Sequence, residues 1–541
     1  MAVSAGARAR RLLGVALGAG RVVAFRAGLV ASLDFGRVVS LGFGLVASLL
    51  VGLPGCARKS EPGAGPGRRL VEAEVLSLRG SADGAFLAYL HRCRRVEDRT
   101  LPPGTAACDL SVVAAAGGES RRVAEGVTTL PHGFGWSAEG HALGALAAYD
   151  HAAGAGALVA WAGGEARHLA DGVSFYALDR AGTRLAYTAD GRLFVAAAAG
   201  GAPAEVPGGE AVTSFEFGGG DGLSLLARKS ARAGGELVSV TGAVVRPVAG
   251  GVQAYAFAPD GRRFAFTMGA EQELRVALAR GGPTTPLGRE VREFAFSPRG
   301  DAIAYVKDAL PGRQGDLWLS PAEGGSPARL AARVGELRWS GAGERLAWLQ
   351  DYDPRSRTGA LATLRPGGKA EVLGRNVSDF DLGAGGEAIA YLVHETAGGY
   401  SVDLALWRAG GGEGRRVERG VFGFSFSPDG RWLYYRSACT REAEACDLVR
   451  VPAAAAGPAE RIAEGVKSFE YGPGHPDRLL VSWARKDRVA LDLATWEAGK
   501  LAALDTYVRP GSAQFLGGDA RRIAWAVVEQ RRQGIWSAEL P

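Results

Sequence analysis

One phrase recurs along the chain and constrains its fold more than any other feature. In its clearest copy, Phe424–Tyr435 (FSFSPDGRWLYY), an alternating apolar strand leads into a Pro-Asp-Gly turn and then into a second alternating strand. Pro428 presets the backbone angle φ at the first turn position, and Gly430 accepts the positive φ that follows. Further copies occupy Tyr255–Thr267 and Phe294–Val306. The phrase predicts a series of strand pairs, and by itself it indicates no reaction.

The spacing of this phrase predicts a propeller. Its turn glycine recurs with a period of about 40 residues, which is typical of four-stranded propeller blades. The aligned glycines are Gly84, Gly140, Gly182, Gly220, Gly261, Gly300, Gly343, Gly385, Gly430, Gly474 and Gly518. Because no long run has the 3.6-residue period of a helix, we expect an all-β fold, a β-propeller of about eleven four-stranded blades.

The two ends of the repeat region indicate how the propeller closes. Arg68–Val75 (RRLVEAEV) resembles the last strand of a blade but precedes the first blade, whereas Gly534–Leu540 ends on a third strand. The extra strand at the start and the missing fourth strand at the end predict a strand clasp, in which the early strand completes another blade. Because eleven blades exceed the usual four to eight of one ring, we expect two tandem rings with a boundary near 260–340. A single oversized ring is the alternative.

The repeats resemble the TolB-like β-propeller repeat family, whose units carry the Ser-Pro-Asp-Gly phrase after an aromatic-rich strand. The resemblance covers roughly residues 70–541 and is strongest at 255–267, 294–306 and 422–435. It implies a propeller fold and a periplasmic compartment. TolB proper also has a separate α/β domain and docks a peptidoglycan-associated lipoprotein. This chain has no room for such a domain between Cys56 and Val71, so the resemblance does not carry over that partner.

Residues 1–55 contain the parts of a secretory signal. Arginines precede an uncharged apolar stretch, 38–55, and Leu53-Pro-Gly-Cys56 resembles a bacterial lipobox. That resemblance implies cleavage before Cys56 and acylation of the cysteine. Residues 56–70 are then a lipidated N-terminus and flexible linker, and 71–541 are the TolB-like repeats. We expect a lipoprotein of the cell envelope, on the periplasmic or surface side of the outer membrane; an uncleaved membrane anchor over 38–55 is the alternative.

The other four cysteines form two pairs in equivalent places. Cys93 with Cys108, and Cys439 with Cys446, each flank the loop between the second and third strands of one blade. In an oxidising compartment, this placement predicts two local disulfides. Free thiols or a metal site are the alternative, but no CxxC or histidine-rich spacing indicates a metal.

Neither the charge nor the motifs indicate nucleic-acid binding or catalysis. The isoelectric point is about 9.1, but six arginines and one aspartate within 1–55 account for most of the net charge of +6. The remainder lacks the basic stripe of a nucleic-acid-binding protein. The chain contains no G-x-S-x-G nucleophile elbow, no H-E-x-x-H zinc motif and no P-loop. We therefore expect no catalytic residue, no metal, no small-molecule cofactor and no nucleic-acid partner.

The loops between second and third strands vary in length from blade to blade, and they would all emerge on one face. Rigid scaffolds commonly present functional residues on such loops. The richest in charge contain Lys307, Asp308, Arg313 and Asp316, and Asp351, Asp353 and Arg355. We expect a non-catalytic scaffold that binds an envelope protein or glycan through these loops. The alternatives are a propeller-type lyase or glycan hydrolase with a central-channel site, and a structural protein without a small ligand; a cation at Asp351 and Asp353 stays open.

Overall fold

The computed structural model describes residues 67–540, except 219–223, 230–234, 242–243, 308–313, 396–401, 441–444, 455–456, 486–488 and the side chains of 208 and 224–229. The predicted signal sequence and Cys56 lie outside these described residues. Within them every regular element is a β-strand, so the predicted all-β class is confirmed. No helix among them has the length and apolar character needed to cross a membrane.

Three sheets contain four antiparallel strands paired in chain order. They are β2 (Val75–Gly80), β3 (Phe86–Arg95), β4 (Ala106–Ala114) and β5 (Arg121–Thr128); β20 (Val291–Phe296), β21 (Ala302–Lys307), β22 (Gly315–Pro321) and β23 (Ala328–Val334); and β31 (Gly423–Phe426), β32 (Trp432–Thr440), β33 (Ala445–Pro452) and β34 (Glu460–Val466).

Three further sheets contain seven strands, because one long middle strand in each belongs to two neighbouring four-stranded units. The first contains β6 (Phe134–Trp136), β7 (Ala142–Asp150), β8 (Ala155–Ala162), β9 (Glu165–Leu178), β10 (Arg184–Ala189), β11 (Arg192–Ala197) and β12 (Ala204–Glu210). The second contains β13 (Val212–Phe217), β14 (Ser224–Lys229), β15 (Gly235–Thr241), β16 (Val244–Phe257), β17 (Arg263–Met268), β18 (Glu273–Leu278) and β19 (Thr285–Gly288). The third contains β24 (Leu337–Trp339), β25 (Leu346–Asp353), β26 (Thr358–Leu364), β27 (Glu371–Leu382), β28 (Ala388–His394), β29 (Val402–Arg408) and β30 (Arg415–Arg419). Strands β9, β16 and β27 each end one four-stranded unit and begin the next.

The last sheet contains eight strands and joins the beginning of the chain to its end. Its members are β35 (Ser468–Gly472), β36 (His475–Ala484), β37 (Leu491–Glu497), β38 (Lys500–Val508), β39 (Gln514–Leu516), β40 (Arg522–Val527), β41 (Gly534–Glu539) and β1 (Arg68–Val71). β1 pairs antiparallel with β41, with Arg68 beside Ser537 and Val71 beside Ile535. This is the strand clasp that the sequence predicted, and β1 begins ahead of residue 71, where the repeats were expected to start.

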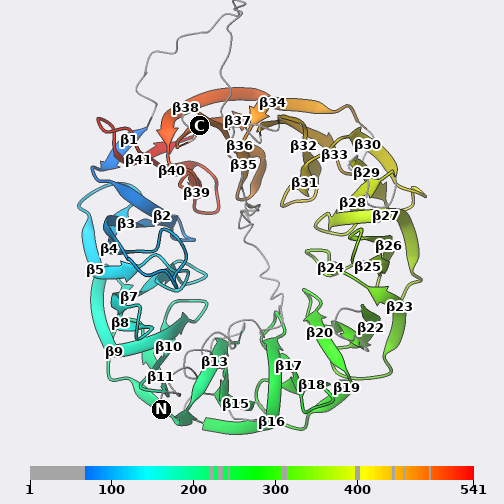
Figure 1. Ribbon diagram of the computed structural model, residues 1–541, viewed down its shortest axis with the longest axis horizontal. Helices are drawn as coiled ribbons and strands as arrows, with labels where there is room; N and C mark the ends of the chain where they lie inside the picture. Colours follow the sequence, from blue (N-terminus) through cyan, green and yellow to red (C-terminus); the bar gives the residue numbers. More distant parts are fainter. Residues whose placement is uncertain are drawn as a thin grey trace, which may run out of the picture.

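The sheets follow one another in chain order around a ring, in a propeller-like arrangement (Figure 1). Buried apolar clusters bridge each unit to the next, for example Val306 and Leu317 against Leu346 and Trp348. The ring closes where Val75 and Leu78 of β2 join Leu516, Ala524 and Ile535 in one such cluster. The prediction of two tandem rings is not confirmed. We correct it to one ring, because this packing continues without a break through 260–340 and a first-to-last contact closes it.

The recurring phrase forms a tight turn between the first and second strands of a unit. In the clearest copy, the Ser427 hydroxyl donates to the Asp429 carboxylate at 2.6 Å and accepts the amide hydrogen of Trp432 at 3.0 Å. Gly430 has a φ of 71° and donates its amide hydrogen to the Ser427 carbonyl. Asp429 therefore caps the turn, since its carboxylate also accepts the amide hydrogen of Arg431 at 3.1 Å.

Antiparallel pairing gives the ring two faces. The turn face carries the connections between first and second, and between third and fourth, strands. Its neighbouring turns touch, as where the amide of Ala342 donates to the carbonyl of Ala384 at 2.8 Å and Arg431 pairs with Asp477 at 3.3 Å. The loop face carries the connections between second and third strands and those leading into the next unit. The described residues of the charged loops that the sequence singled out lie on the loop face; they are Lys307, Asp316, Asp351, Asp353 and Arg355.

Candidate functional site

The two predicted disulfides are present and lie on the loop face. Cys93 is bonded to Cys108 between β3 and β4, and Cys439 is bonded to Cys446 between β32 and β33. Both cross-links join the end of a second strand to the start of a third. The prediction of two local disulfides is therefore confirmed, and each cross-link restrains the ends of the two strands that it joins.

The first predicted binding loop is only partly described. Asp308 and Arg313 lie outside the described residues. Lys307 places its ammonium group 4.4 Å from the ring centre of Trp318, a cation–π contact. Asp316 pairs with Arg329 of the fourth strand at 2.7 Å. Both described charges therefore have partners within their own unit.

The second predicted loop is held together mainly by its own polar groups. Asp351 pairs with Arg333, which precedes β24, at 2.6 Å. The Asp353 carboxylate accepts the amide hydrogen of Arg355 at 2.9 Å and the hydroxyl hydrogen of Ser356 at 3.1 Å. The Arg355 amide holds the pKa of Asp353 below its ordinary value. Asp351 and Asp353 thus have separate partners, and no group of three or more metal-ligating side chains is found among the described residues.

A row of acidic side chains, which the sequence analysis did not single out, runs along three consecutive inner strands. Glu293 lies on β20, Glu336 directly precedes β24, and Asp379 lies on β27. Each is the second residue after a buried valine, in Val291-Arg-Glu, Val334-Gly-Glu and Val377-Ser-Asp. Aligning the repeats on that valine would have found the row. We call these three residues the acidic row.

One arginine joins part of the acidic row. The guanidinium of Arg338 lies 2.7 Å from Glu336 and 3.0 Å from Asp379, and it also donates to the carbonyl of Phe380 on the neighbouring unit. Burial raises the pKa of Asp379, although Arg338 opposes that change. Burial also raises the pKa of Asp381, two residues further along β27. More carboxylates than guanidinium groups therefore share this part of the inner wall.

A hollow of about 170 Å³ connects the acidic row to the first predicted loop. Its wall includes Arg292 and Glu293 of one unit, Glu336 of the next, and Gln314 and Gly315 at the end of the loop. Charged groups and an amide side chain thus meet between two units on the loop face. Such a surface suits a polar partner, because it offers hydrogen-bond donors and acceptors together.

A cluster of imidazole and phenol groups occupies the loop face of the β2–β5 and β6–β9 units. His132 and Tyr149 approach to 3.0 Å, and His151 lies 3.0 Å from the Thr128 hydroxyl. Burial, aided by the nearby His151, lowers the pKa of His132. The seven histidines are far apart in the sequence, so the sequence did not predict this cluster. The signal in the sequence is the longer connection between Val127 and Phe134, where most other repeats have two residues.

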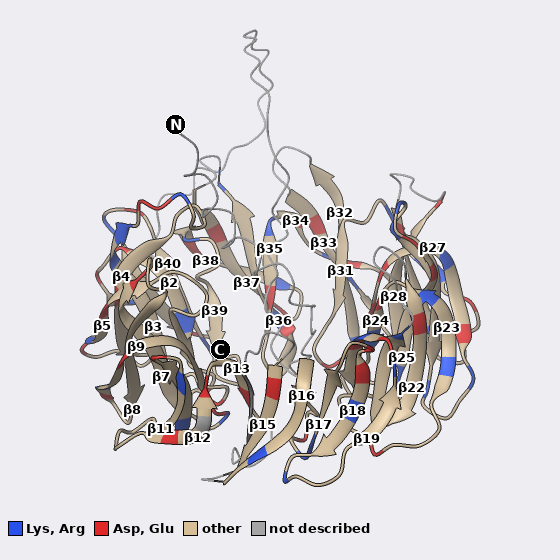
Figure 2. Cartoon of the chain, turned by 60° about the horizontal axis from the view of Figure 1, so that its bottom comes forward, with Lys and Arg blue, Asp and Glu red and all other residues tan. Residues whose placement is uncertain are grey.

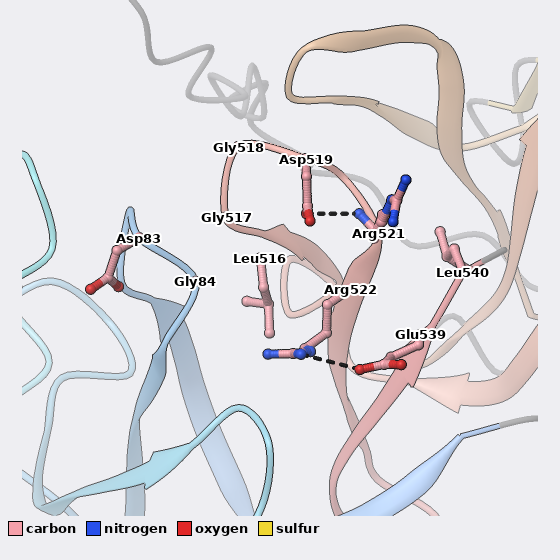
Figure 3. A pocket seen from close by; sticks show the side chains of 10 residues that line it. All are labelled: Asp83, Gly84, Leu516, Gly517, Gly518, Asp519, Arg521, Arg522, Glu539 and Leu540. Carbon is pink, nitrogen blue, oxygen red and sulfur yellow. Dashed lines mark hydrogen bonds and ion pairs between the residues drawn. The ribbon is translucent and has the colours of Figure 1, made fainter.

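A second, larger hollow lies on the turn face at the seam where the ring closes (Figure 3). Its volume is about 570 Å³, and the turn that contains Asp83 and Gly84 lies beside the β39–β40 turn across it, with the Asp83 carboxylate directed away from that turn. Asp519 accepts the amide hydrogen of Arg521 at 3.1 Å, and Arg522 pairs with Glu539 at 3.1 Å. These contacts stabilise the β39–β40 turn and the pairing of β40 with β41. The lining includes no serine, cysteine or histidine that could act as a nucleophile with its base.

Charges of both signs are interspersed over the outer strands of the ring (Figure 2). Residues of both signs occur on β27, as with Glu371, Arg375 and Asp379.

Comparisons with known proteins do not place the chain in a family. No protein-family model matches it, and no curated protein matches it. Among solved structures, it is similar to a eukaryotic initiation factor, with 15% identity and a TM-score of 0.41 over 62% of this chain and 87% of the other. It is also similar to the tricorn protease, with 11% identity and a TM-score of 0.28 over 87% of this chain and 61% of the other. Dipeptidyl peptidase 4 of Porphyromonas gingivalis has 13% identity and a TM-score of 0.37, over 69% of this chain and 65% of the other. At these scores the similarities carry no argument about activity.

Proposed function

We propose that this chain is an exported, lipid-anchored scaffold of the bacterial cell envelope. Its ring would comprise eleven four-stranded blades of the TolB-like kind and bind a protein or glycan, without catalysis, through its loop face. Two disulfides support the assignment to an oxidising compartment, because such bonds persist outside the reducing cytosol. The lipobox-like Leu53–Cys56 supports the anchor.

The observation that carries the binding role is the contrast between the two faces. Turns on the turn face repeat one phrase and touch each other, whereas the loop face presents longer loops, two of them cross-linked. The hollow beside Glu293, Glu336 and Gln314 lies among those loops. Carboxylate and amide groups in such a hollow can accept hydrogen bonds from sugar hydroxyls or from basic side chains. This chemistry favours a glycan or a basic segment of an envelope protein.

Site-specific photo-cross-linking in cells tests the binding role. A photoreactive residue at Arg355, exposed on the loop face, should yield a covalent adduct with a defined partner. The matched control is Glu344, exposed on the turn face of the same unit. In a separate pull-down without the photoreactive residue, replacing 307–316 and 350–359 by tight Asn-Gly turns should abolish capture of that partner. Adducts from Glu344 alone, or capture unchanged by the loop replacement, would place the interface elsewhere.

Membrane fractionation tests the anchor. Cys56→Ser should move the protein from the membrane fraction to the soluble fraction, and the N-terminal peptide of the wild type should carry acyl chains. A variant that stays in the membrane would instead favour an uncleaved anchor over 38–55.

A propeller-type lyase or glycan hydrolase is the second candidate, and one observation favours it. Burial raises the pKa of Asp381, and desolvation raises that of Glu470 on β35 to about 7, although part of the Glu470 side chain is exposed. Carboxyl groups with raised pKa values can act as general acids near neutral pH. Release of new sugar ends from envelope glycans, lost in Glu470→Gln with the fold intact, would establish this activity.

A further inference from the structure

The described chain begins on the turn face. β41 runs from Gly534, which follows a loop-face connection, to Glu539 at the turn face. Because β1 is antiparallel to β41, its first residue, Arg68, lies beside Ser537 near the turn-face end. The side chain of Arg68 donates to the carbonyl of Ala116, in the connection between β4 and β5 on that same face.

β1, the first described strand, is also at the outer edge of the ring. In the closing unit, the strands from the centre outward are β39, β40, β41 and β1 (Figure 1). Leu70 and Val71 pack against the closing cluster, so β1 is held by apolar contacts as well as by its pairing. Any group attached ahead of Gly67 is therefore tethered to the rim of the turn face.

The tether is short compared with the height of the ring. As a flexible chain, Cys56 to Gly67 spans about 20 Å on average and at most about 40 Å when fully extended. A strand such as β32 (Trp432–Thr440) rises about 30 Å from one face to the other. An anchored Cys56 could bring the loop face to a membrane only if the tether were nearly straight along the outer wall. That arrangement is disfavoured by the loss of chain entropy.

We propose that the turn face lies against the lipid bilayer, so that the loop face is directed away from it. This orientation rests on the proposed lipid anchor at Cys56. The short tether determines this orientation. Surface charge does not, because the turns carry charges of both signs, as in the Asp429–Arg431 pair and the Arg431–Asp477 pair. Loops closed by Cys93–Cys108 and by Cys439–Cys446 then extend toward partners in the aqueous compartment.

Energy transfer from the protein to the membrane tests this orientation. Cysteines placed at Glu344 on the turn face and at Arg355 on the loop face can each carry a donor fluorophore; both positions are exposed and belong to the β24–β27 unit. The four ring cysteines are in disulfides and an acylated Cys56 has no thiol, so only the added cysteine reacts. Acylated protein is reconstituted into phosphatidylethanolamine–phosphatidylglycerol vesicles that contain an acceptor-labelled lipid.

The two labels should differ clearly. The Glu344→Cys label should transfer energy to the vesicle at least about twice as efficiently as the Arg355→Cys label, because about 30 Å of strand separates the faces. Equal or reversed efficiencies would overturn the orientation. The same comparison in concentrated salt should give the same ratio, since a tether is not screened by ions.

A second tether separates this inference from the proposed anchor. In a variant with Cys56→Ser, a hexahistidine tag replaces residues 1–55 and holds the chain on vesicles that contain a nickel-chelating lipid. If the natural N-terminus proves to be unacylated, the proposed anchor fails, but this tagged chain should still show greater transfer from the Glu344→Cys label. If the tagged chain shows equal transfer from both labels, the orientation itself is wrong.

Discussion

Gly84 and Gly517 meet backbone to backbone where the ring closes. A Cβ atom added to Gly84 would lie 2.4 Å from the backbone nitrogen of Gly517, so the turn between β2 and β3 and the turn between β39 and β40 leave no room for a side chain. Gly84 also has a φ of 70°, which residues with a side chain rarely adopt. Closure of the ring therefore depends on a contact between two backbones, far apart in the chain, in addition to the clasp.

Gly84→Ala should destabilise the ring more than an equivalent change elsewhere. Gly511→Ala is the matched control, because Gly511 has a φ of 72° but no atom within 4 Å of an added Cβ. Both changes should cost about 1–2 kcal/mol from the left-handed backbone conformation. Gly84→Ala should cost a further 1–3 kcal/mol, roughly, from overpacking at the seam. Denaturant midpoints measure the difference, and equal midpoints would show that the two turns can separate without loss of stability.

Removing the clasp should expose the edge of β41. A chain that begins at residue 72 lacks β1, and β41 then presents unpaired backbone groups to solvent. We expect a lower thermal midpoint and concentration-dependent aggregation, measured by light scattering during heating. A chain that begins at residue 67 keeps β1 and is the control. If both chains unfold and aggregate alike, the clasp does not stabilise the closed ring.

The two disulfides should stabilise the protein to different extents. Cys93 and Cys108 are 15 residues apart, whereas Cys439 and Cys446 are 7 apart. On the chain-entropy account, replacing the first pair by serine should cost about 3 kcal/mol and the second about 2.4 kcal/mol. Unfolding in denaturant with the other pair intact measures each cost. The order of the two costs is the decisive result, and a greater loss from the shorter loop would mean that local contacts outweigh chain entropy.

The sequence predicted the strand pattern well, because each repeat carries its own turn chemistry and its own apolar alternation. The clasp was also predictable, since Arg68–Val71 has the pattern of a strand without a unit ahead of it. The number of rings was not predictable, because it depends on the angle between neighbouring sheets and not on any local motif. Closure becomes visible only in contacts between the first and last units, as in the buried cluster that contains Val75 and Ile535.

The candidate site was predicted only in part, for a related reason. Charged loops stand out in a sequence, and Asp351 and Asp353 do lie on the loop face. The acidic row comes from three separate repeats, and its members approach each other only after the strands are placed side by side. Arg338, which binds Glu336 and Asp379, sits in an ordinary-looking strand. A comparison of repeats by position within the strand would have been more informative than the composition of each loop.

Asp381→Asn should raise the free energy of unfolding at neutral pH. Burial raises the pKa of Asp381, so the folded protein holds its proton more tightly than the unfolded chain does. Stability therefore falls as the pH rises from the unfolded value, about 3.8, through the folded pKa, and the full cost is present above that range. The asparagine does not titrate, so its advantage should be absent near pH 3.8 and should grow to a plateau toward neutral pH.

Asp353→Asn is the control of opposite sign. The amide of Arg355 lowers the pKa of Asp353, so this carboxylate adds stability above its unfolded pKa and loses that effect as the pH falls through the folded value. Its removal should lower the denaturant midpoint at neutral pH, or leave it unchanged where the asparagine oxygen caps the loop equally well. Urea unfolding between about pH 4 and pH 8 measures both variants. A loss of stability in Asp381→Asn at neutral pH would mean that the ionised carboxylate, with Arg338 as its counter-charge, holds the inner strands together.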